Sequence, residues 1–182
     1  GIGFLILFEP YRLARALSFT NPWADPLGTG YQLSNALMAF GRGEWFGTGL
    51  GHSVQKLSYL PEAHTDFMLA VLGEEFGFVG ISIVIGLSFT MLACCIKIGH
   101  RALKHNFLRA GYLAYGISII FLLQIIVNAG MNMGLMPTKG LTLPFISYGG
   151  TSLMMCAAMI SLILRVDAST QELNPDREES NF

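Results

Sequence analysis

The residues with the greatest capacity for chemistry gather between positions 59 and 75. This stretch contains Glu62, His64 and Asp66, and it ends in the acidic pair Glu74-Glu75. A carboxylate or an imidazole can remove a proton from a reacting hydroxyl as a general base. Ionisable groups close to a bilayer are costly, so they tend to be functional or paired. The stretch is therefore the first candidate for a catalytic segment.

Local structure offers a second interpretation of the same acids. Thr65 or Asp66 would make a good N-cap for a helix that follows, because a side-chain oxygen there accepts a hydrogen bond from the first turn. The residues alone favour capping or solvation over catalysis at Asp66. They also favour a structural role for His64, and a solvated surface position for Glu62 and the pair Glu74-Glu75.

A second candidate segment covers residues 136–152. It places the lone Lys139 between two prolines and then enters a helix through Ser147-Tyr-Gly-Gly150. Exposed N–H groups at a helix N-terminus bind anions, and paired glycines let a ligand approach closely. A turn with a packing glycine pair explains the pattern equally well. The glycine-rich Gly47–Gly51 segment is better explained as a turn than as a phosphate-binding loop, because no buried strand precedes it.

The elements that carry these segments are membrane spans. Apolar residues make up 52% of the 182 positions and charged residues only 13%, against about 25% charged in soluble domains. The ranges 76–96, 110–138 and 140–164 contain no charge at all, and each is long enough for a span of about 20 residues. This excludes an ordinary cytosolic enzyme and a secreted disulfide module. The net charge of -1 argues against nucleic acid as a partner. The three cysteines all fall in apolar runs and are interpreted as packing residues, with no metal-ligand cluster.

The bias of Lys and Arg sets the expected orientation of these spans. The 97–109 stretch carries four cations and no acid, whereas the 129–146 stretch carries only Lys139, so the first should be cytoplasmic and the second periplasmic. The expected segments are the end of a truncated transmembrane helix (1–8), a large periplasmic loop with short helices (9–77), a transmembrane helix (78–98), a cytoplasmic loop (99–109), a transmembrane helix (110–128), a periplasmic loop (129–146), a transmembrane helix (147–164) and a disordered cytoplasmic tail (165–182).

The 9–77 segment is long for a connection, and its many aromatic residues predict that it folds rather than staying disordered. Short helices are expected at 32–40 and 67–77, with a glycine-rich bend at 41–51 between them. Because the chain opens inside an apolar run, Gly1 is expected to be a cut through a membrane helix, with sequence missing upstream.

Several motifs in order resemble the SEDS family of bacterial membrane proteins. They are Asn21-Pro-Trp-x-Asp-Pro-x-Gly-x-Gly-Tyr-Gln32, Gly47-x-Gly-Leu-Gly51, Gln55-Lys56, Tyr59-Leu-Pro-Glu-Ala-His-Thr-Asp-Phe67, Gly73-Glu-Glu-x-Gly77, Pro137-Thr-Lys-Gly-Leu-Thr-Leu-Pro144 and Ile146-Ser-Tyr-Gly-Gly150. The residues within these motifs are more similar to those of the cell-division branch of Gram-negative bacteria than to those of the elongation or sporulation branches. Met131-Asn-Met133 departs from the family pattern, and we expect that departure to affect lipid contacts rather than chemistry.

This resemblance implies an all-α polytopic membrane protein, of which the chain would be the C-terminal fragment of a ten-helix SEDS fold. It implies a peptidoglycan glycosyltransferase that polymerises lipid II at the division septum of the bacterial inner membrane. The implied partners are membrane lipid, a class B penicillin-binding protein (FtsI in the division branch) and other divisome proteins. A lipid II flippase or other transporter, and a division-complex scaffold, remain the alternatives.

The family's essential acid maps by motif onto Asp66, which reverses the preference for a cap there. Transfer with inversion at the sugar carbon needs one general base, and we expect Asp66 to supply it. The leaving pyrophosphate needs cations or backbone donors, and a divalent cation, Mg²⁺ or Mn²⁺, is a further candidate for that task. The residues expected to bind substrate are Lys139, Ser147, Tyr148, Gly149, Gly150, Glu62, His64, Lys56 and Arg42.

Overall fold

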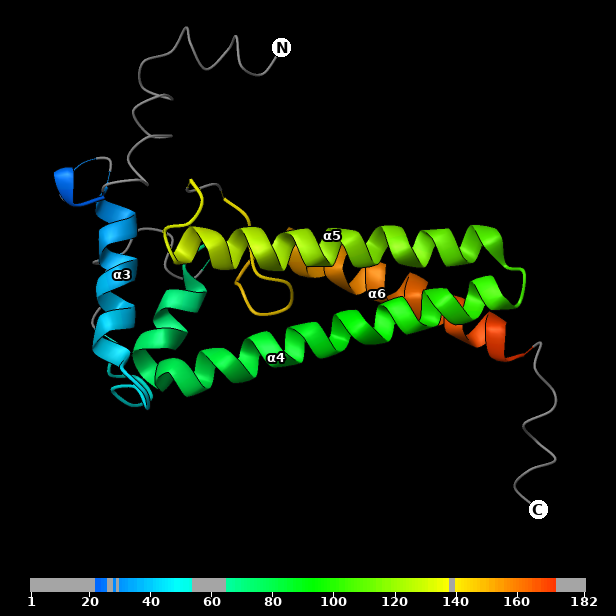
Figure 1. The fold of residues 1–182 in the computed structure, drawn as a ribbon, viewed down its shortest axis with the longest axis horizontal. Helices are drawn as coiled ribbons and strands as arrows, with labels where there is room; N and C mark the ends of the chain where they lie inside the picture. Colours follow the sequence, from blue (N-terminus) through cyan, green and yellow to red (C-terminus); the bar gives the residue numbers. More distant parts are fainter. Residues whose placement is uncertain (1–21, 26–27, 29, 54–64, 138–139, 173–182) are drawn as a thin grey trace, which may run out of the picture. The chain divides into compact units, whose positions relative to one another are not determined.

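The computed structural model describes residues 22–25, 28, 30–53, 65–137 and 140–172. Regular structure in these ranges is entirely helical, with no strand, which confirms the predicted all-α class (Figure 1). The elements are η1 (Pro22–Ala24), α3 (Tyr31–Gly43), α4 (Met68–Lys104), α5 (Leu108–Asn132) and α6 (Gly150–Gln171). The predicted helix stub at 1–8 lies outside the described residues.

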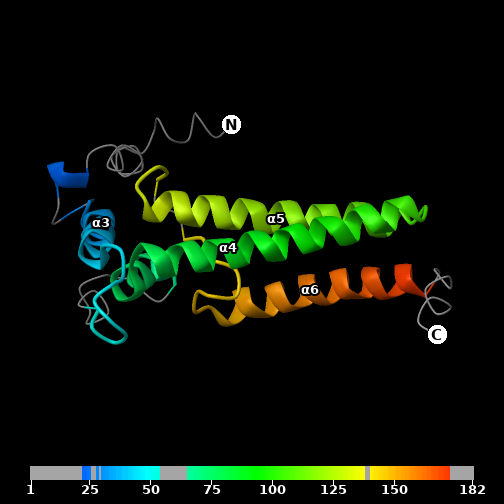
Figure 2. The same cartoon turned by 60° about the horizontal axis from the view of Figure 1, so that its bottom comes forward.

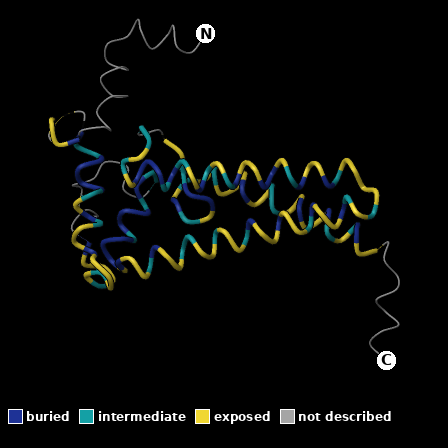
Figure 3. Tube along the Cα trace, in the orientation of Figure 1, coloured by how far each residue is buried: buried dark blue, intermediate teal, exposed yellow. Residues whose placement is uncertain are grey.

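Helices α4, α5 and α6 are long and apolar enough to cross a membrane. The shortest, α6, has 22 residues and is therefore about 33 Å long, against a hydrocarbon core of about 30 Å. Large apolar side chains such as Ile83, Leu87 and Ile119 are exposed along these helices, and exposed positions recur along each helix in Figure 3. An exposed apolar helix surface is what a lipid environment requires. Each of the three predicted spans thus corresponds to a helix that is long and apolar enough to cross a membrane.

The helices extend further than the sequence predicted. The expected 99–109 loop is wrong over most of its length, because α4 runs to Lys104 and only residues 105–107 connect it to α5. The expected 129–146 loop loses its first four residues to α5. Lys and Arg side chains can reach water from a helix that continues past the hydrocarbon. A charge therefore marks the edge of the apolar region and not the end of the helix.

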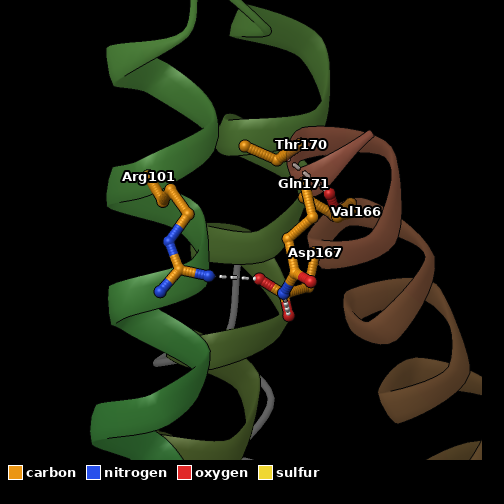
Figure 4. A network of polar contacts seen from close by, with 5 residues as sticks. All are labelled: Arg101, Val166, Asp167, Thr170 and Gln171. Carbon is orange, nitrogen blue, oxygen red and sulfur yellow. Dashed lines mark hydrogen bonds and ion pairs between the residues drawn. The ribbon is translucent and has the colours of Figure 1, made fainter. Parts of the chain in front are cut away.

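The last helix shows the same effect at its polar end. Helix α6 begins at Gly150 instead of residue 147 and continues to Gln171, so the predicted disordered tail at 165–182 is wrong for residues 165–171. Asp167 holds this end in place. Its Oδ1 accepts a hydrogen bond of 2.8 Å from Arg101 Nη1 of α4, and its Oδ2 accepts one of 2.7 Å from Gln171 Nε2 (Figure 4).

The described chain divides into two compact units. One contains residues 86–123 and the chain from Gly149 onward, where the second part of α4, the first part of α5 and α6 run alongside one another (Figure 2). Its core is made of apolar side chains from all three helices: Leu92, Cys95, Ile117, Phe121, Cys156 and Ile163. Cys95 and Cys156 are buried packing residues as predicted, whereas Cys94 is exposed.

The other unit contains the chain up to Ile85 and residues 124–148. Helix α3 packs on the first two turns of α4 through a core of small and aromatic side chains: Ala36, Ala39, Phe67, Ala70 and Val71. A second core of Leu69, Ile81, Ile125 and Leu143 joins α4 to the end of α5 and to the loop after it. The predicted 32–40 helix is real but longer, and the predicted 41–51 bend begins only after Gly43.

Helix α4 bends sharply at Gly77, whose backbone (φ 66°, ψ -163°) lies in a region that essentially only glycine occupies (Figure 1). The bend leaves the carbonyls of Glu74 and Glu75 and the N–H groups of Phe78 and Val79 without their partners within the helix. The loop at 44–49 supplies all four partners.

The hydrogen bonds form two pairs. Phe78 N–H donates to Glu44 O (2.9 Å) and Val79 N–H donates to Trp45 O (3.2 Å). In the other direction, Thr48 N–H donates to Glu74 O (2.9 Å) and Gly49 N–H donates to Glu75 O (3.1 Å). Buried backbone groups must be paired inside a membrane protein. The glycine-rich 44–49 loop is thus inserted into the hydrogen-bond ladder of α4, which is a turn function and not phosphate binding.

Candidate active site

Asp66 lies two residues before the first residue of α4 and is partly accessible to solvent. The segment is fixed by Phe67, which is 3% exposed and packs in the core shared with α3. The carbonyl of Phe67 accepts the N–H groups of Ala70 (2.9 Å) and Val71 (3.2 Å). The cap position is therefore Phe67, and the prediction that Thr65 or Asp66 occupies it is wrong. Asp66 is left in the turn ahead of the helix.

The first turn of α4 is capped from another helix instead. Ala70 N–H also donates to Oδ1 of Asn132 (3.2 Å), at the end of α5. The same amide donates from Nδ2 to the carbonyl of Asp66 (3.0 Å). Asn132 is completely buried; its bond with Ala70 is buried and its bond with Asp66 is partly buried. The expectation that the Met131-Asn-Met133 departure affects lipid contacts rather than chemistry stays a prediction, and Asn132 within it bonds to the backbone of Asp66.

Asn128, one turn earlier on α5, connects Asp66 to the second candidate segment. Its Nδ2 donates to Asp66 O (3.1 Å) and to Leu141 O (2.6 Å). Two stretches more than 60 residues apart in sequence therefore meet at one buried amide. Sequence reasoning did not single out Asn128 or Asn132. Their available signal was the spacing of two asparagines four residues apart at the end of an apolar span, because polar groups there are costly.

The carboxylate of Asp66 faces the backbone of Gly140. A methyl group placed on Gly140 would lie 3.2 Å from Asp66 Oδ2 and 3.9 Å from Oδ1. Gly140 is itself exposed. A larger side chain at position 140 would therefore crowd the Asp66 carboxylate. Lys139, the neighbour of Gly140 in sequence, lies outside the described residues.

The loop that follows Gly140 closes on itself before α6. Leu143 N–H donates to Ser147 Oγ (2.8 Å), and Ser147 N–H donates back to Leu143 O (3.1 Å). Ser147 is buried, whereas Tyr148 is 79% exposed. In this arrangement Ser147 shapes the loop, and Tyr148 is the side chain of the pair that a ligand can reach. Phe145 holds a left-handed backbone (φ 62°), which only a tightly determined turn imposes on a bulky residue.

The glycine pair predicted to begin the last helix, Gly149-Gly150, lies in the unit that contains residues 86–123. Gly149 is the N-cap residue, with no side-chain cap, and Gly150 is the first helical residue. A methyl group on Gly150 would meet no atom within 4 Å, so the first turn of α6 is open to its surroundings.

Glu74 and Glu75 were expected on the surface, and that expectation is wrong. Glu74 is completely buried and Glu75 is 8% exposed. Ser53 Oγ donates to Glu74 Oε2 (2.5 Å), and Arg42 Nη1 lies 3.5 Å from Glu74 Oε1. Arg42, predicted to hold substrate, is therefore an ion-pair partner whose side chain remains 54% exposed. Glu75 Oε1 is buried and has no hydrogen-bond partner in the described structure.

Three further predicted residues, Lys56, Glu62 and His64, lie outside the described residues, as does Lys139. Among the residues that the structure does describe, no group of three His, Cys, Asp or Glu side chains is placed to hold a metal ion. The described residues around Asp66 therefore do not by themselves form a fitted divalent-cation site. In the described structure the arrangement consists of the partly exposed Asp66, the backbone of Gly140 beside its carboxylate, and two buried amides that bond to the Asp66 carbonyl, one of which also bonds to the 140–147 loop.

Comparison with known proteins identifies the family to which the chain belongs. The sequence profile of the FtsW/RodA/SpoVE family, described as cell cycle proteins, matches residues 2–172. The chain belongs to this family. The resemblance to SEDS proteins found in the sequence motifs is confirmed, and the two motif segments that meet at Asn128 both lie inside the matched range.

Curated relatives and a solved structure agree with the assignment. The chain is 98% identical to the probable peptidoglycan glycosyltransferase FtsW of Acinetobacter baylyi, covering all of this chain and 46% of that protein. It is 56% identical to the protein of the same description from Aliivibrio salmonicida, over 90% of this chain and 41% of the relative. A solved chain from work on polymerization and crosslinking by a peptidoglycan synthase complex superposes with a TM-score of 0.69 at 28% identity, covering 93% of this chain and 46% of that one. The chain thus spans about half the length of these proteins.

Proposed function

We propose that the chain is the C-terminal part of a peptidoglycan glycosyltransferase that polymerises lipid II into glycan strands during septal cell-wall synthesis. The observation that supports this best is Asp66, a partly exposed aspartate whose backbone carbonyl accepts hydrogen bonds from two buried asparagines. The relatives named as probable peptidoglycan glycosyltransferases support the reaction class.

In the proposed reaction, the 4-hydroxyl oxygen of the acceptor GlcNAc attacks C1 of the donor MurNAc. The bond from C1 to the pyrophosphate oxygen breaks, and its electrons leave with undecaprenyl pyrophosphate. Asp66 takes the hydroxyl proton as the new bond forms. One displacement inverts the α linkage to β, so a single general base is sufficient.

The other predicted residues complete this proposal. Lys139 and the open first turn of α6 would stabilise the charge of the departing pyrophosphate. Lys56, Glu62, His64 and Tyr148 would contact the sugars or phosphates of the substrate. EDTA treatment, with Mg²⁺ or Mn²⁺ added back, tests the separate expectation that such an ion assists pyrophosphate departure.

The proposed setting is the bacterial inner membrane at the division septum. The charge bias predicts that the segment with Asp66 faces the periplasm, where lipid II presents its sugars. The solved structure of a synthase complex supports a partner enzyme, and we propose a class B penicillin-binding protein of the FtsI type.

The test uses the full-length protein, purified with that partner and supplied with fluorescent lipid II. Glycan ladders on a gel are expected from the wild type and not from Asp66→Asn. Glu44→Gln is the control, because it neutralises an exposed carboxylate that lies on the 44–49 loop. Equal ladders from wild type and Asp66→Asn would refute the general base. No ladder from the wild type would instead favour a flippase or a scaffold, and a lipid II translocation assay would separate these two.

A further inference from the structure

Asn128 uses its whole side-chain amide to join two segments. The amide has two N–H donors, and they go to the carbonyls of Asp66 (3.1 Å) and Leu141 (2.6 Å). Its Oδ1 accepts a hydrogen bond from Asn132 Nδ2 (3.3 Å). The residue is 0% exposed, so its amide is shielded from water, and the two bonds to the carbonyls are partly buried. Donors and acceptor are all engaged.

This pattern fixes the orientation of the amide. Turned by 180°, it would place Oδ1 against the two carbonyl oxygens and leave its N–H groups without acceptors. Leaving buried polar groups unpaired costs more than the bonds gain when made. The bond network therefore has one arrangement, and that arrangement sets the spacing between residues 66 and 141.

The two carbonyls are the ones that position the proposed reaction centre. One belongs to Asp66 itself, and the other is next in sequence to Gly140, whose backbone faces the Asp66 carboxylate. Asn132 repeats the hydrogen bond to Asp66 O but makes none to Leu141 in the described structure. Its other partners are Ala70 N–H and the backbone O and side-chain Oδ1 of Asn128. Only Asn128 spans both segments in the described structure.

We infer that Asn128 is a positioning residue, which holds the Asp66 carboxylate at a fixed separation from the 140–147 loop and thereby sets the rate of glycosyl transfer. This inference rests on the proposed function. Asn132 assists by fixing the start of α4. Misplacing a catalytic group by about 1 Å costs roughly 100-fold in rate, so loss of this spacing acts on turnover and not on substrate binding.

The experiment measures kcat and KM of lipid II polymerisation with the full-length protein and its class B partner. Asn128→Ala is expected to lower kcat about 100-fold with KM within about 3-fold of the wild type. Asn132→Ala is expected to lower kcat less, because the Leu141 contact remains. Ser118→Ala is the matched control: Ser118 is also buried on α5, but it bonds only to Ala114 O of its own helix (2.7 Å). Its kcat is expected to match that of the wild type.

A double-mutant comparison separates positioning from general loss of structure. If Asn128 acts through the base, Asn128→Ala removes little further activity from an Asp66→Glu protein, in which the carboxylate is already displaced. Multiplied losses in the double variant, or a wild-type kcat in folded Asn128→Ala, would overturn the inference. If Asn128→Ala does not fold, Asn128→Ser and Asn132→Ala replace it, each compared alone and combined with Asp66→Glu. Multiplied losses in kcat, or a wild-type kcat in the folded single variant, would again overturn the inference. Full activity of Asp66→Asn would refute the proposed function itself, which is a distinct outcome.

Discussion

Replacing Gly77 by alanine tests how the bend in α4 is maintained. The new methyl group would lie 2.5 Å from Gly47 N and 2.6 Å from both C and O of Trp45, all of them backbone atoms of the inserted loop. Alanine would also have to adopt a backbone region that costs a non-glycine residue about 1–3 kcal/mol. The loop and the bend therefore cannot both persist in Gly77→Ala.

The contacts of the 44–49 loop give the expected loss of free energy in Gly77→Ala. If the loop leaves, four backbone hydrogen bonds are lost at about 1 kcal/mol each. The straightened helix regains two of them, from Phe78 N–H to Glu74 O and from Val79 N–H to Glu75 O. The edge-to-face contact of Trp45 with Phe78 (5.4 Å between ring centroids) contributes about 1 kcal/mol more. The net loss is about 3 kcal/mol.

Hydrogen exchange followed by mass spectrometry of the full-length protein measures this outcome. Peptides that contain Thr48 and Gly49 should lose about 100-fold in protection, because about 1.4 kcal/mol corresponds to a factor of ten. Peptides that contain Phe78 and Val79 should stay protected, since their N–H groups find helical partners. Gly86→Ala on the same helix is the control, because its methyl group meets no atom within 4 Å. Wild-type protection at the 44–49 loop in Gly77→Ala would refute this reasoning.

Two further predictions concern polar contacts of each unit. Ser53→Ala removes the hydroxyl that donates to the buried Glu74 carboxylate and should lower the free energy of unfolding by about 1–3 kcal/mol, measured as a lower thermal midpoint. Ser82→Ala, at an exposed position, is the control and should leave the midpoint unchanged. An equal effect of both variants would contradict a stabilising role for the Ser53–Glu74 hydrogen bond. The Arg101–Asp167 ion pair is partly exposed, so a double-mutant cycle should give a coupling energy below about 1 kcal/mol that falls with added salt. A larger, salt-independent coupling would show that the pair is shielded from water.

The sequence by itself determined which segments are long and apolar enough to cross a membrane. Three charge-free runs predicted three spans, because the hydrocarbon core excludes charge and requires every backbone group to be paired within a helix. The spans became α4, α5 and α6. Their ends could not be predicted in this way, because helices such as α4 and α6 continue past the last apolar residue when their polar side chains find water or a partner, as Asp167 does.

The motifs also placed Asp66 and the 137–150 segment in one family and in one proposed site. Motifs carry this information without any knowledge of contacts, and the family profile that matches residues 2–172 confirms the assignment. The prediction of a surface position for Glu74 and Glu75, made from local sequence alone, was wrong. Acids next to each other in sequence give no sign of whether a neighbouring segment, here Ser53 and Arg42, covers them.

Tertiary structure decided how the candidate site is held together. Asn128 and Asp66 are 62 positions apart, and so are Asn132 and Ala70, so no local pattern predicts that they meet. An asparagine near the end of an apolar span is only a costly polar residue until the fold brings carbonyls to its amide. The physical reason is that hydrogen bonds depend on distance and direction in space, whereas sequence patterns record only the period of the local backbone.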